Sequence, residues 1–222
     1  MPPPSTNRLV IIITLVCMGL FALAPELDLS VSRMLFRDGG FVGAFTAAGD
    51  AARRVFWDAP YVVLAGFLAA YALRRMGRIR RGPDGRAVIF LVATLALGPG
   101  LLLNGALKEH SGRPRPVFSK EFGGDWGFRP WYDFRGECDT NCSFASGETG
   151  ASAWTLAPAL LAPPPARAYA VAAALLLTVA TGALRVAYGG HYLSDVTLAA
   201  LFTILIVLAG YRWYSRGSKS WI

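Results

Sequence analysis

Apolar and polar stretches alternate along the chain in long blocks. Six apolar segments stand out, at roughly residues 9–25, 55–73, 87–107, 147–162, 168–184 and 192–211. Several have an apolar core shorter than the ~20 residues that span hydrocarbon, so they need their flanking polar turns to cross. Those polar groups must then face protein or a water-filled cavity. The pattern predicts an all-α, polytopic membrane protein, a bundle of six transmembrane helices in which residues 1–222 form one domain.

The composition agrees with this class. Hydrophobic residues make up 54% of the 222 positions and charged residues only 16%, against about 25% charged in soluble domains. The net charge of +8 raises nucleic acid as a partner, but the arginines are divided among short loops and form no single basic face. We therefore expect the bilayer as the partner and no nucleic acid. The first segment has only Arg8 before it and no small-x-small cleavage site, which predicts a retained helix.

Arginines in one short loop predict the orientation. The connection between the second and third segments carries Arg74, Arg75, Arg78, Arg80, Arg81 and Arg86, and such clusters stay in the cytoplasm. With six spans, both termini share that side. The two long connections, residues 26–54 and 108–146, then lie outside, the second as a cap. These features predict a multi-pass protein of a bacterial inner (plasma) membrane whose outer loops face the periplasm.

Two shorter features lie in these outer connections. Apolar residues between Leu27 and Phe36 recur at helical spacing, which fits a helix lying flat at the interface or an ordinary amphipathic packing helix. Cys138 and Cys142 stand in a polar loop. They would be free thiols in a reducing compartment and a small disulfide in a periplasm.

Three polar clusters carry candidate chemistry, at residues 108–116, 143–148 and 185–195. Lys108, Arg115 and Arg185 are cations at the ends of apolar helices, where a charge needs a partner, and guanidinium groups match phosphate oxygens. Ser146 and Gly147 open a helix, whose free N–H groups and dipole favour an anion. Together these residues predict a site for a highly charged oxyanion.

The third cluster also supplies a nucleophile with an orienting group. His191 and Asp195 are four residues apart, so on a helix they share one face and the carboxylate can hold one ring nitrogen. The other nitrogen is then free to attack. The alternative is a histidine satisfied within a helix cap. The chain has only two histidines, His110 and His191, and both fall in these clusters, which favours a functional role.

The spacing of these residues resembles the signature of the type-2 phosphatidate phosphatase (PAP2) superfamily, which includes membrane lipid phosphatases and soluble vanadium haloperoxidases. The matching residues are Lys108, Arg115, Pro116, Ser146, Gly147, Arg185, His191 and Asp195. The resemblance implies a route without metal or cofactor, in which His191 attacks phosphorus and forms a phosphohistidine. Asp195 would orient His191, and the cations would neutralise the transition state.

The sequence departs from the family pattern at Glu148, where the family usually has the histidine that protonates the leaving group. We expect Glu148 to act as the general acid. The alternatives are that it only pairs with a neighbouring cation, or that His110 is the donor. A second departure is Leu184 before Arg185, where the family often has serine.

The resemblance therefore implies a lipid phosphate phosphohydrolase with its active site at the outer interface. Lipid A, undecaprenyl diphosphate, phosphatidylglycerol phosphate and phosphatidate are candidate substrates. The cap contains many aromatic residues, Phe118, Phe122, Trp126, Phe128, Trp131, Tyr132 and Phe134, which slightly favours a saccharolipid or polyprenyl substrate. A lipid-to-lipid phosphotransferase and a catalytically inactive lipid-binding relative are the alternatives.

Overall fold

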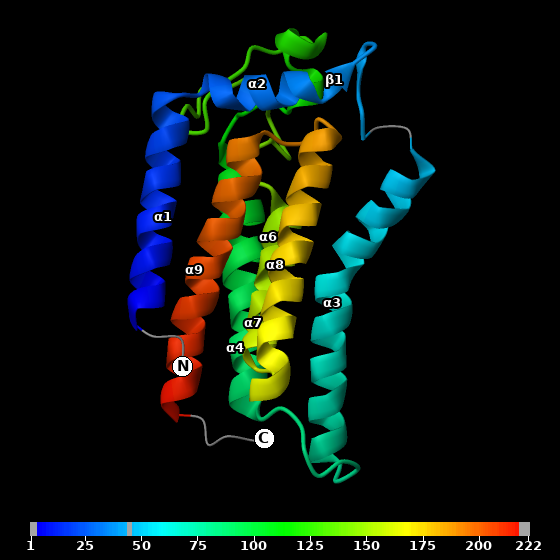
Figure 1. The fold of residues 1–222 in the computed structure, drawn as a ribbon, viewed down its shortest axis with the longest axis vertical. Coiled ribbons are helices and arrows are strands. Elements are labelled where there is room, and N and C mark those ends of the chain that lie inside the picture. The colour runs from blue at the N-terminus through cyan, green and yellow to red at the C-terminus, as the bar shows by residue number, and fades with distance from the viewer. Residues whose placement is uncertain (1–3, 44–45, 218–222) are drawn as a thin grey trace.

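The computed structural model describes residues 4–43 and 46–217 and is a bundle of long helices (Figure 1). Within these ranges, five helical stretches are long and apolar enough to cross a membrane. They are α1 (Pro4–Leu23), α3 (Ala47–Arg75), the continuous run of α4 (Gly85–Leu95), the π-helical η1 (Ala96–Leu107) and α5 (Lys108–His110), then α8 (Pro164–Ala187) and α9 (Leu193–Gly217). The all-α membrane fold is confirmed.

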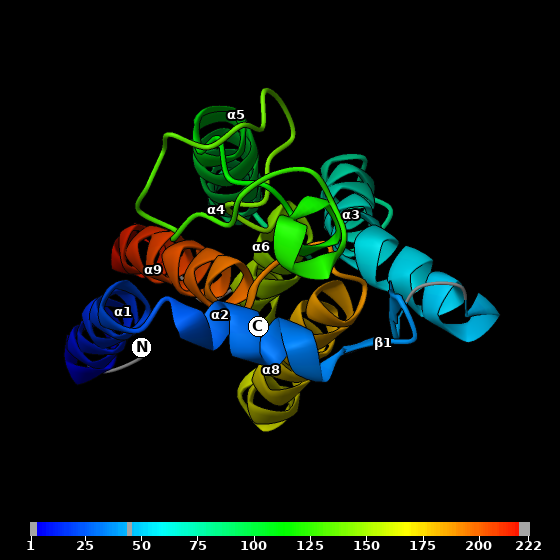
Figure 2. The same cartoon turned by 90° about the horizontal axis from the view of Figure 1, so that it is seen from above.

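The fourth predicted segment, residues 147–162, is not one long helix. It forms two short helices, α6 (Gly147–Trp154) and α7 (Leu156–Leu160), which meet at Thr155. Pro158 explains the break, because it has no N–H to donate to Trp154 and its ring would clash with that carbonyl. Figure 2 shows α6 near the centre of the bundle, surrounded by α3, α4, α8 and α9. A count of six spans is therefore not confirmed.

Small residues let the neighbouring helices approach α6 closely. A Cβ at Gly150 would collide with the Leu103 side chain of η1, so any larger residue there would require Leu103 to move. At the other end of α6 the fully buried Trp154 donates its indole N–H to Leu91 O (3.1 Å) and Thr94 Oγ1 (3.0 Å). A buried indole needs such a partner, and this one ties α6 to α4.

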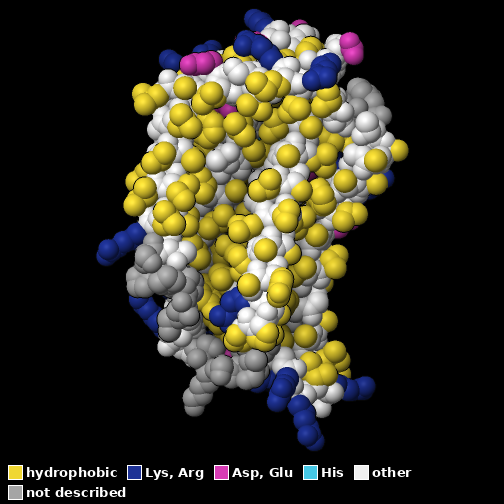
Figure 3. Space-filling model, in the orientation of Figure 1, with side chains coloured by type: hydrophobic (Ala, Val, Ile, Leu, Met, Phe, Trp, Pro, Cys, Tyr) yellow, Lys and Arg dark blue, Asp and Glu magenta, His cyan; other side chains and the backbone are white. Residues whose placement is uncertain are grey.

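Hydrophobic side chains cover the flanks of the bundle, whereas charged side chains gather at its two ends (Figure 3). Many exposed large hydrophobic residues lie on α1, α3 and α8, among them Leu15, Val62 and Val179. Such an exposed apolar surface would be costly in water and fits contact with lipid.

One end of the bundle carries every motif cluster. The helix α2 (Glu26–Met34) crosses this end, followed by the hairpin of β1 (Phe36–Arg37) and β2 (Gly40–Phe41) (Figure 1). The cap contributes the 3-10 turns η2 (Pro116–Phe118) and η3 (Lys120–Phe122). The loop between α3 and α4, which holds the arginine cluster, lies at the opposite end (Figure 1).

The structure also bears on three local expectations. The stretch from Leu27 forms α2, which buries Asp28 and Ser32 against the bundle and so packs on it through polar residues; an interfacial position of its other face stays a prediction. Cys138 and Cys142 form a disulfide, as predicted for an oxidising compartment. The helix expected from Val55 begins eight residues earlier at Ala47, because Thr46 caps it by accepting the Gly49 N–H (3.2 Å).

Candidate active site

A polar cavity of about 430 Å³ opens at the end of the bundle where the motifs meet. Its lining includes five cations and two carboxylates: Arg53, Arg54, Lys108, Arg115 and Arg185, with Asp50 and Glu148. His191, Trp57, Asn104 and Asn141 complete the wall. The excess of positive charge in a partly desolvated cleft favours a multiply charged anion.

The ring of His191 is held by a backbone carbonyl. It lies in the turn between α8 and α9, 1% exposed, with Nδ1 2.7 Å from Ser143 O. A carbonyl oxygen only accepts, so Nδ1 carries the proton and donates it, and Nε2 keeps its lone pair. This tautomer is the one that a nucleophilic histidine requires.

Asp195 stands behind His191 at a longer distance than a direct hydrogen bond. Its Oδ2 is 3.8 Å from His191 Nδ1, while the Ser143 hydroxyl (2.5 Å) and the Tyr192 N–H (2.8 Å) donate to that same oxygen. Ser143 O takes the short hydrogen bond from Nδ1 and Asp195 makes a longer ion-pair contact with the same nitrogen, so the role of Asp195 in orienting the ring stays a prediction. Asp195 contributes a nearby negative charge and fixes Ser143.

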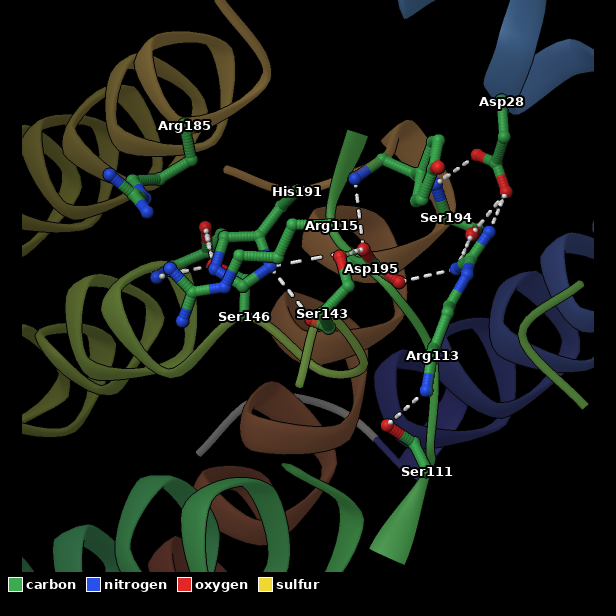
Figure 4. A network of polar contacts seen from close by, with 12 residues as sticks. Asp28, Ser111, Arg113, Arg115, Ser143, Ser146, Arg185, His191, Ser194 and Asp195 are labelled. Atoms are coloured by element: carbon green, nitrogen blue, oxygen red, sulfur yellow. Dashed lines mark hydrogen bonds and ion pairs between the residues drawn. The ribbon is translucent and has the colours of Figure 1, made fainter. Parts of the chain in front are cut away.

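A buried arginine connects Asp195 to α2. Arg113 is fully buried and bonds Asp195 through Nη1 and Asp28 Oδ2 through Nη2 (2.7 Å). Asp28 in turn accepts the Ser194 N–H (2.8 Å) and hydroxyl (2.6 Å). Figure 4 shows Arg113 lying between the two carboxylates. One cation is thus shared by two buried acids, and removal of Arg113 leaves both carboxylates without their cation.

Arg185 and Arg115 flank His191 (Figure 4). Arg185 is only 4% exposed, and among the described residues its Nε has no hydrogen-bond partner. Arg115 Nη2 donates to Asn141 O (2.9 Å) and Asn141 Oδ1 (2.8 Å), which fixes the guanidinium while other N–H groups remain for a ligand. A buried cation with unused donors is a prepared oxyanion site.

Glu148 pairs with cations in this cavity. Its two oxygens accept from Arg53 Nη2 (2.8 Å) and Nε (3.2 Å), and Oε1 lies 3.4 Å from Arg185 Nε. Two guanidinium groups favour the ionised carboxylate, which is the arrangement expected if Glu148 only pairs with a cation. Its role as general acid stays a prediction.

Ser146 and Gly147 lie beside the cavity lining. The Ser146 side chain caps α6, with Oγ 3.4 Å from Thr149 N and 2.9 Å from Thr149 Oγ1. Gly147 packs against the Asn104 side chain so closely that a Cβ would overlap it. Both residues position the start of α6, and any contact with phosphate stays a prediction.

Comparison with known proteins identifies the family. Residues 86–219 match the family model of the PAP2 superfamily. The chain belongs to this superfamily. Two relatives named lipid A 4'-phosphatase, from Rhizobium leguminosarum and Rhizobium etli, are 34% and 32% identical over 208 and 209 residues. The alignments cover 86% of this chain in both cases, and 89% and 80% of the relatives.

Two further matches are more distant or shorter. A lipid A 4'-phosphatase of Francisella tularensis subsp. novicida is 37% identical over 121 residues, or 54% of each chain. The crystal structure of a transmembrane PAP2 type phosphatidylglycerolphosphate phosphatase from Bacillus subtilis superimposes with a TM-score of 0.64. It covers 96% of this chain and 98% of its own at 16% identity, which shows a shared fold.

Several residues of the PAP2 site were not found from the sequence. Arg53 reaches Glu148 from α3, 95 positions away, and Asp28 reaches Ser194 across 166 positions. Arg113 stood inside the first cluster, but the signature does not include it. One local signal was an acid and a serine four residues apart, Asp28 and Ser32, which share one face of α2.

Burial gives this PAP2 protein an expected pH dependence. It lowers the pKa of the His191 imidazole to about 4, although the Asp195 carboxylate opposes that shift. Protonation at lower pH blocks Nε2, so kcat/KM should fall about tenfold per pH unit below about pH 4. A profile of kcat/KM against pH with a soluble aryl phosphate measures this. An acid limb near 6.5, the ordinary value for histidine, would contradict it.

Proposed function

We propose that this PAP2 protein removes the 4'-phosphate of lipid A at the outer face of a bacterial inner membrane. It is a phosphatase that acts on a membrane lipid head group, in keeping with its family and its relatives. The observation that carries the proposed chemistry is His191, whose unprotonated Nε2 belongs to a cavity lined by five cations. The relatives' printed activity narrows the lipid to lipid A.

In the proposed mechanism, Nε2 of His191 attacks phosphorus as the bond to the leaving oxygen breaks. The imidazole becomes positive, and the Asp195 carboxylate, 3.8 Å away, stabilises that charge. Lys108, Arg115 and Arg185 stabilise the charge on the phosphoryl oxygens. The leaving alkoxide takes a proton from a general acid, and water then attacks phosphorus, breaks the P–N bond and releases inorganic phosphate.

The test is phosphate release by the purified protein in detergent from a panel of lipid phosphates. We expect lipid A 4'-phosphate to be turned over with the highest kcat/KM, and turnover to persist with chelators present. Product analysis distinguishes hydrolysis from transfer, since a phosphotransferase would need an acceptor lipid. Preference for phosphatidate or undecaprenyl diphosphate would overturn the substrate proposal.

We predict that the rate lost in Glu148→Gln depends on the leaving group of the substrate, and this dependence distinguishes the two possible roles of Glu148. If Glu148 is the general acid, Glu148→Gln should lower kcat about 10²-fold or more on a lipid phosphate and much less on an aryl phosphate. An aryl oxide leaves without help from a proton. If Glu148 only holds Arg53 and Arg185, both substrates should lose rate equally. Stopped assays on the two substrates measure the ratio.

We predict that the active-site end faces the periplasm, because the loop of residues 76–84 and its flanking arginines lie at the opposite end. In intact cells, Arg80→Cys should resist a membrane-impermeant thiol reagent, whereas Arg135→Cys, 83% exposed in the cap, should react. Labelling in a background without Cys138 and Cys142 avoids interference from those thiols. Reaction at Arg80→Cys alone would reverse the orientation.

A further inference from the structure

A second pocket adjoins the catalytic cavity, and we propose that it binds a sugar ring of the lipid head group. The inference rests on the proposed function and adds to it a subsite for saccharide. The pocket measures about 350 Å³ and shares Arg115 and Asn141 with the catalytic cavity. Its remaining lining is Phe118, Trp126, Cys138, Asp139 and Thr140. A substrate whose phosphate reaches His191 would place its neighbouring atoms here.

The wall of this subsite combines aromatic faces with hydrogen-bonding groups. The ring centroids of Phe118 and Trp126 lie 5.8 Å apart, with the ring planes at 66°. Phe118 is 50% exposed. A sugar ring has apolar C–H faces and a polar edge, so it can pack on an aromatic ring while its hydroxyl groups bond a polar rim. Thr140 and Asp139 supply that rim.

The charge at the rim of the pocket favours a sugar over a second phosphate as the occupant. Asp139 is a carboxylate that accepts hydrogen bonds and repels anions. Arg115 of the same lining offsets this charge, so the pocket offers no excess of positive charge to a second phosphate, whereas Asp139 and Thr140 offer acceptors to the hydroxyl and amide donors of a sugar. A glycerol backbone has no ring face to cover Phe118 and Trp126. The lining therefore fits a saccharide head group better than a polyprenyl diphosphate or a glycerolipid.

Backbone hydrogen bonds hold the aromatic wall in place. The Trp126 N–H donates to Phe118 O (3.1 Å), and the Lys120 N–H donates to Trp126 O (2.8 Å). Next to Phe118, the Val117 N–H donates to Gly189 O (3.0 Å), which lies two residues before the nucleophile. The wall is thus fixed relative to His191 before any ligand binds, which reduces the entropy lost on binding.

The opposite wall is fixed by the disulfide. The disulfide from Cys138 to Cys142 closes a short loop that contains Thr140 and Asn141. Asn141 Oδ1 in turn accepts a hydrogen bond from Arg115 Nη2. The Cys142 N–H also donates to Lys108 O (3.2 Å). Both walls of the subsite are therefore tied to residues of the catalytic cavity.

The experiment compares substrates with and without a sugar. Phe118→Ala and Trp126→Ala should each raise KM for lipid A about tenfold, as lost stacking on a bound ring does, with kcat nearly unchanged. KM for phosphatidate and for glycerol phosphate, neither of which has a ring next to the phosphate, should change less than twofold. Asp139→Asn should raise KM for lipid A and leave the other two substrates unaffected.

The matched control is Phe134→Ala, an aromatic residue of the same cap with similar exposure (48%) that does not line the pocket. An unchanged KM for lipid A in both aromatic variants would overturn the subsite. Equal increases in KM for lipid A and for phosphatidate would also overturn it. So would a Phe134→Ala variant that raised KM for lipid A as much as Phe118→Ala or Trp126→Ala does. Isothermal titration of lipid A into detergent-solubilised His191→Ala protein, with and without the subsite substitutions, tests the subsite without turnover. Tenfold weaker binding in Trp126→Ala supports it even if lipid A is not hydrolysed.

Discussion

Replacing His191 by alanine is expected to abolish phosphate release, with a loss of about 10⁴-fold or more in kcat. The reason is that His191 is the one imidazole in the lining of the cavity, as far as the structure describes the chain, and its Nε2 keeps a free lone pair, whereas Lys108 and Glu148 are placed to pair with charges. Trapping with radiolabelled lipid phosphate should give an acid-labile phosphoprotein in the wild type and none in His191→Ala. Release of inorganic phosphate over hours measures the residual rate.

The other histidine of the chain gives the control for this prediction. His110 is exposed and does not line the cavity, so His110→Ala should keep kcat within about threefold of the wild type. A severe, leaving-group-dependent defect there would instead assign it the role of acid. Turnover in His191→Ala above about one hundredth of the wild-type rate would refute the phosphohistidine mechanism.

Replacing Arg113 by methionine is expected to cause the largest loss of stability among single changes near the site. Methionine keeps much of the volume but leaves Asp28 and Asp195 buried without their cation. Breaking a buried pair in this way costs about 3–5 kcal/mol, which lowers Tm by roughly 10 °C or more in a chain of this size. Thermal unfolding in detergent measures the shift, and kcat should fall about 10²-fold because Asp195 is no longer held.

An exposed arginine of the same cap is the matched control. Arg135 bonds Asp133 at 2.8 Å but is 83% exposed, so Arg135→Met should leave Tm and kcat unchanged within error. Adding Asp28→Asn to Arg113→Met should recover part of the lost Tm, because it removes one of the two unpaired charges. Equal Tm values for Arg113→Met and Arg135→Met would show that the buried network does not stabilise the fold.

The buried network also explains why α2 belongs to the site. The sequence from Leu27 to Phe36 fitted either an interfacial helix or a packing helix. In the structure, Asp28 projects from α2 toward Ser194 and Arg113 (Figure 4). A charged group at that position is retained only where a partner meets it. That partner is supplied by the residues around the catalytic motif, so α2 and the nucleophile are linked through Arg113.

The sequence by itself determined the membrane helices and the identity of the motif residues. Long apolar runs can satisfy their backbone only as helices in lipid, so the pattern located all five long helices, with ends that differ from the structure by up to eight residues. Lys108, Arg115, Arg185 and His191 were recognised by spacing, and the structure brings all four to one cavity. The Cys138–Cys142 disulfide was also predicted, because a short polar loop brings two thiols near each other without long-range information.

Only the tertiary structure decided which groups surround those residues. Ser143 O, rather than Asp195, receives the His191 Nδ1–H, because the backbone before α6 runs past the imidazole. Arg53 and Asp28 come from α3 and α2, and neither helix carries a motif. The physical reason is that a hydrogen bond or an ion pair depends on positions in space within a few ångströms. Residues 95 or 166 positions apart are brought to that distance by helix packing, which a single sequence does not encode in any local pattern.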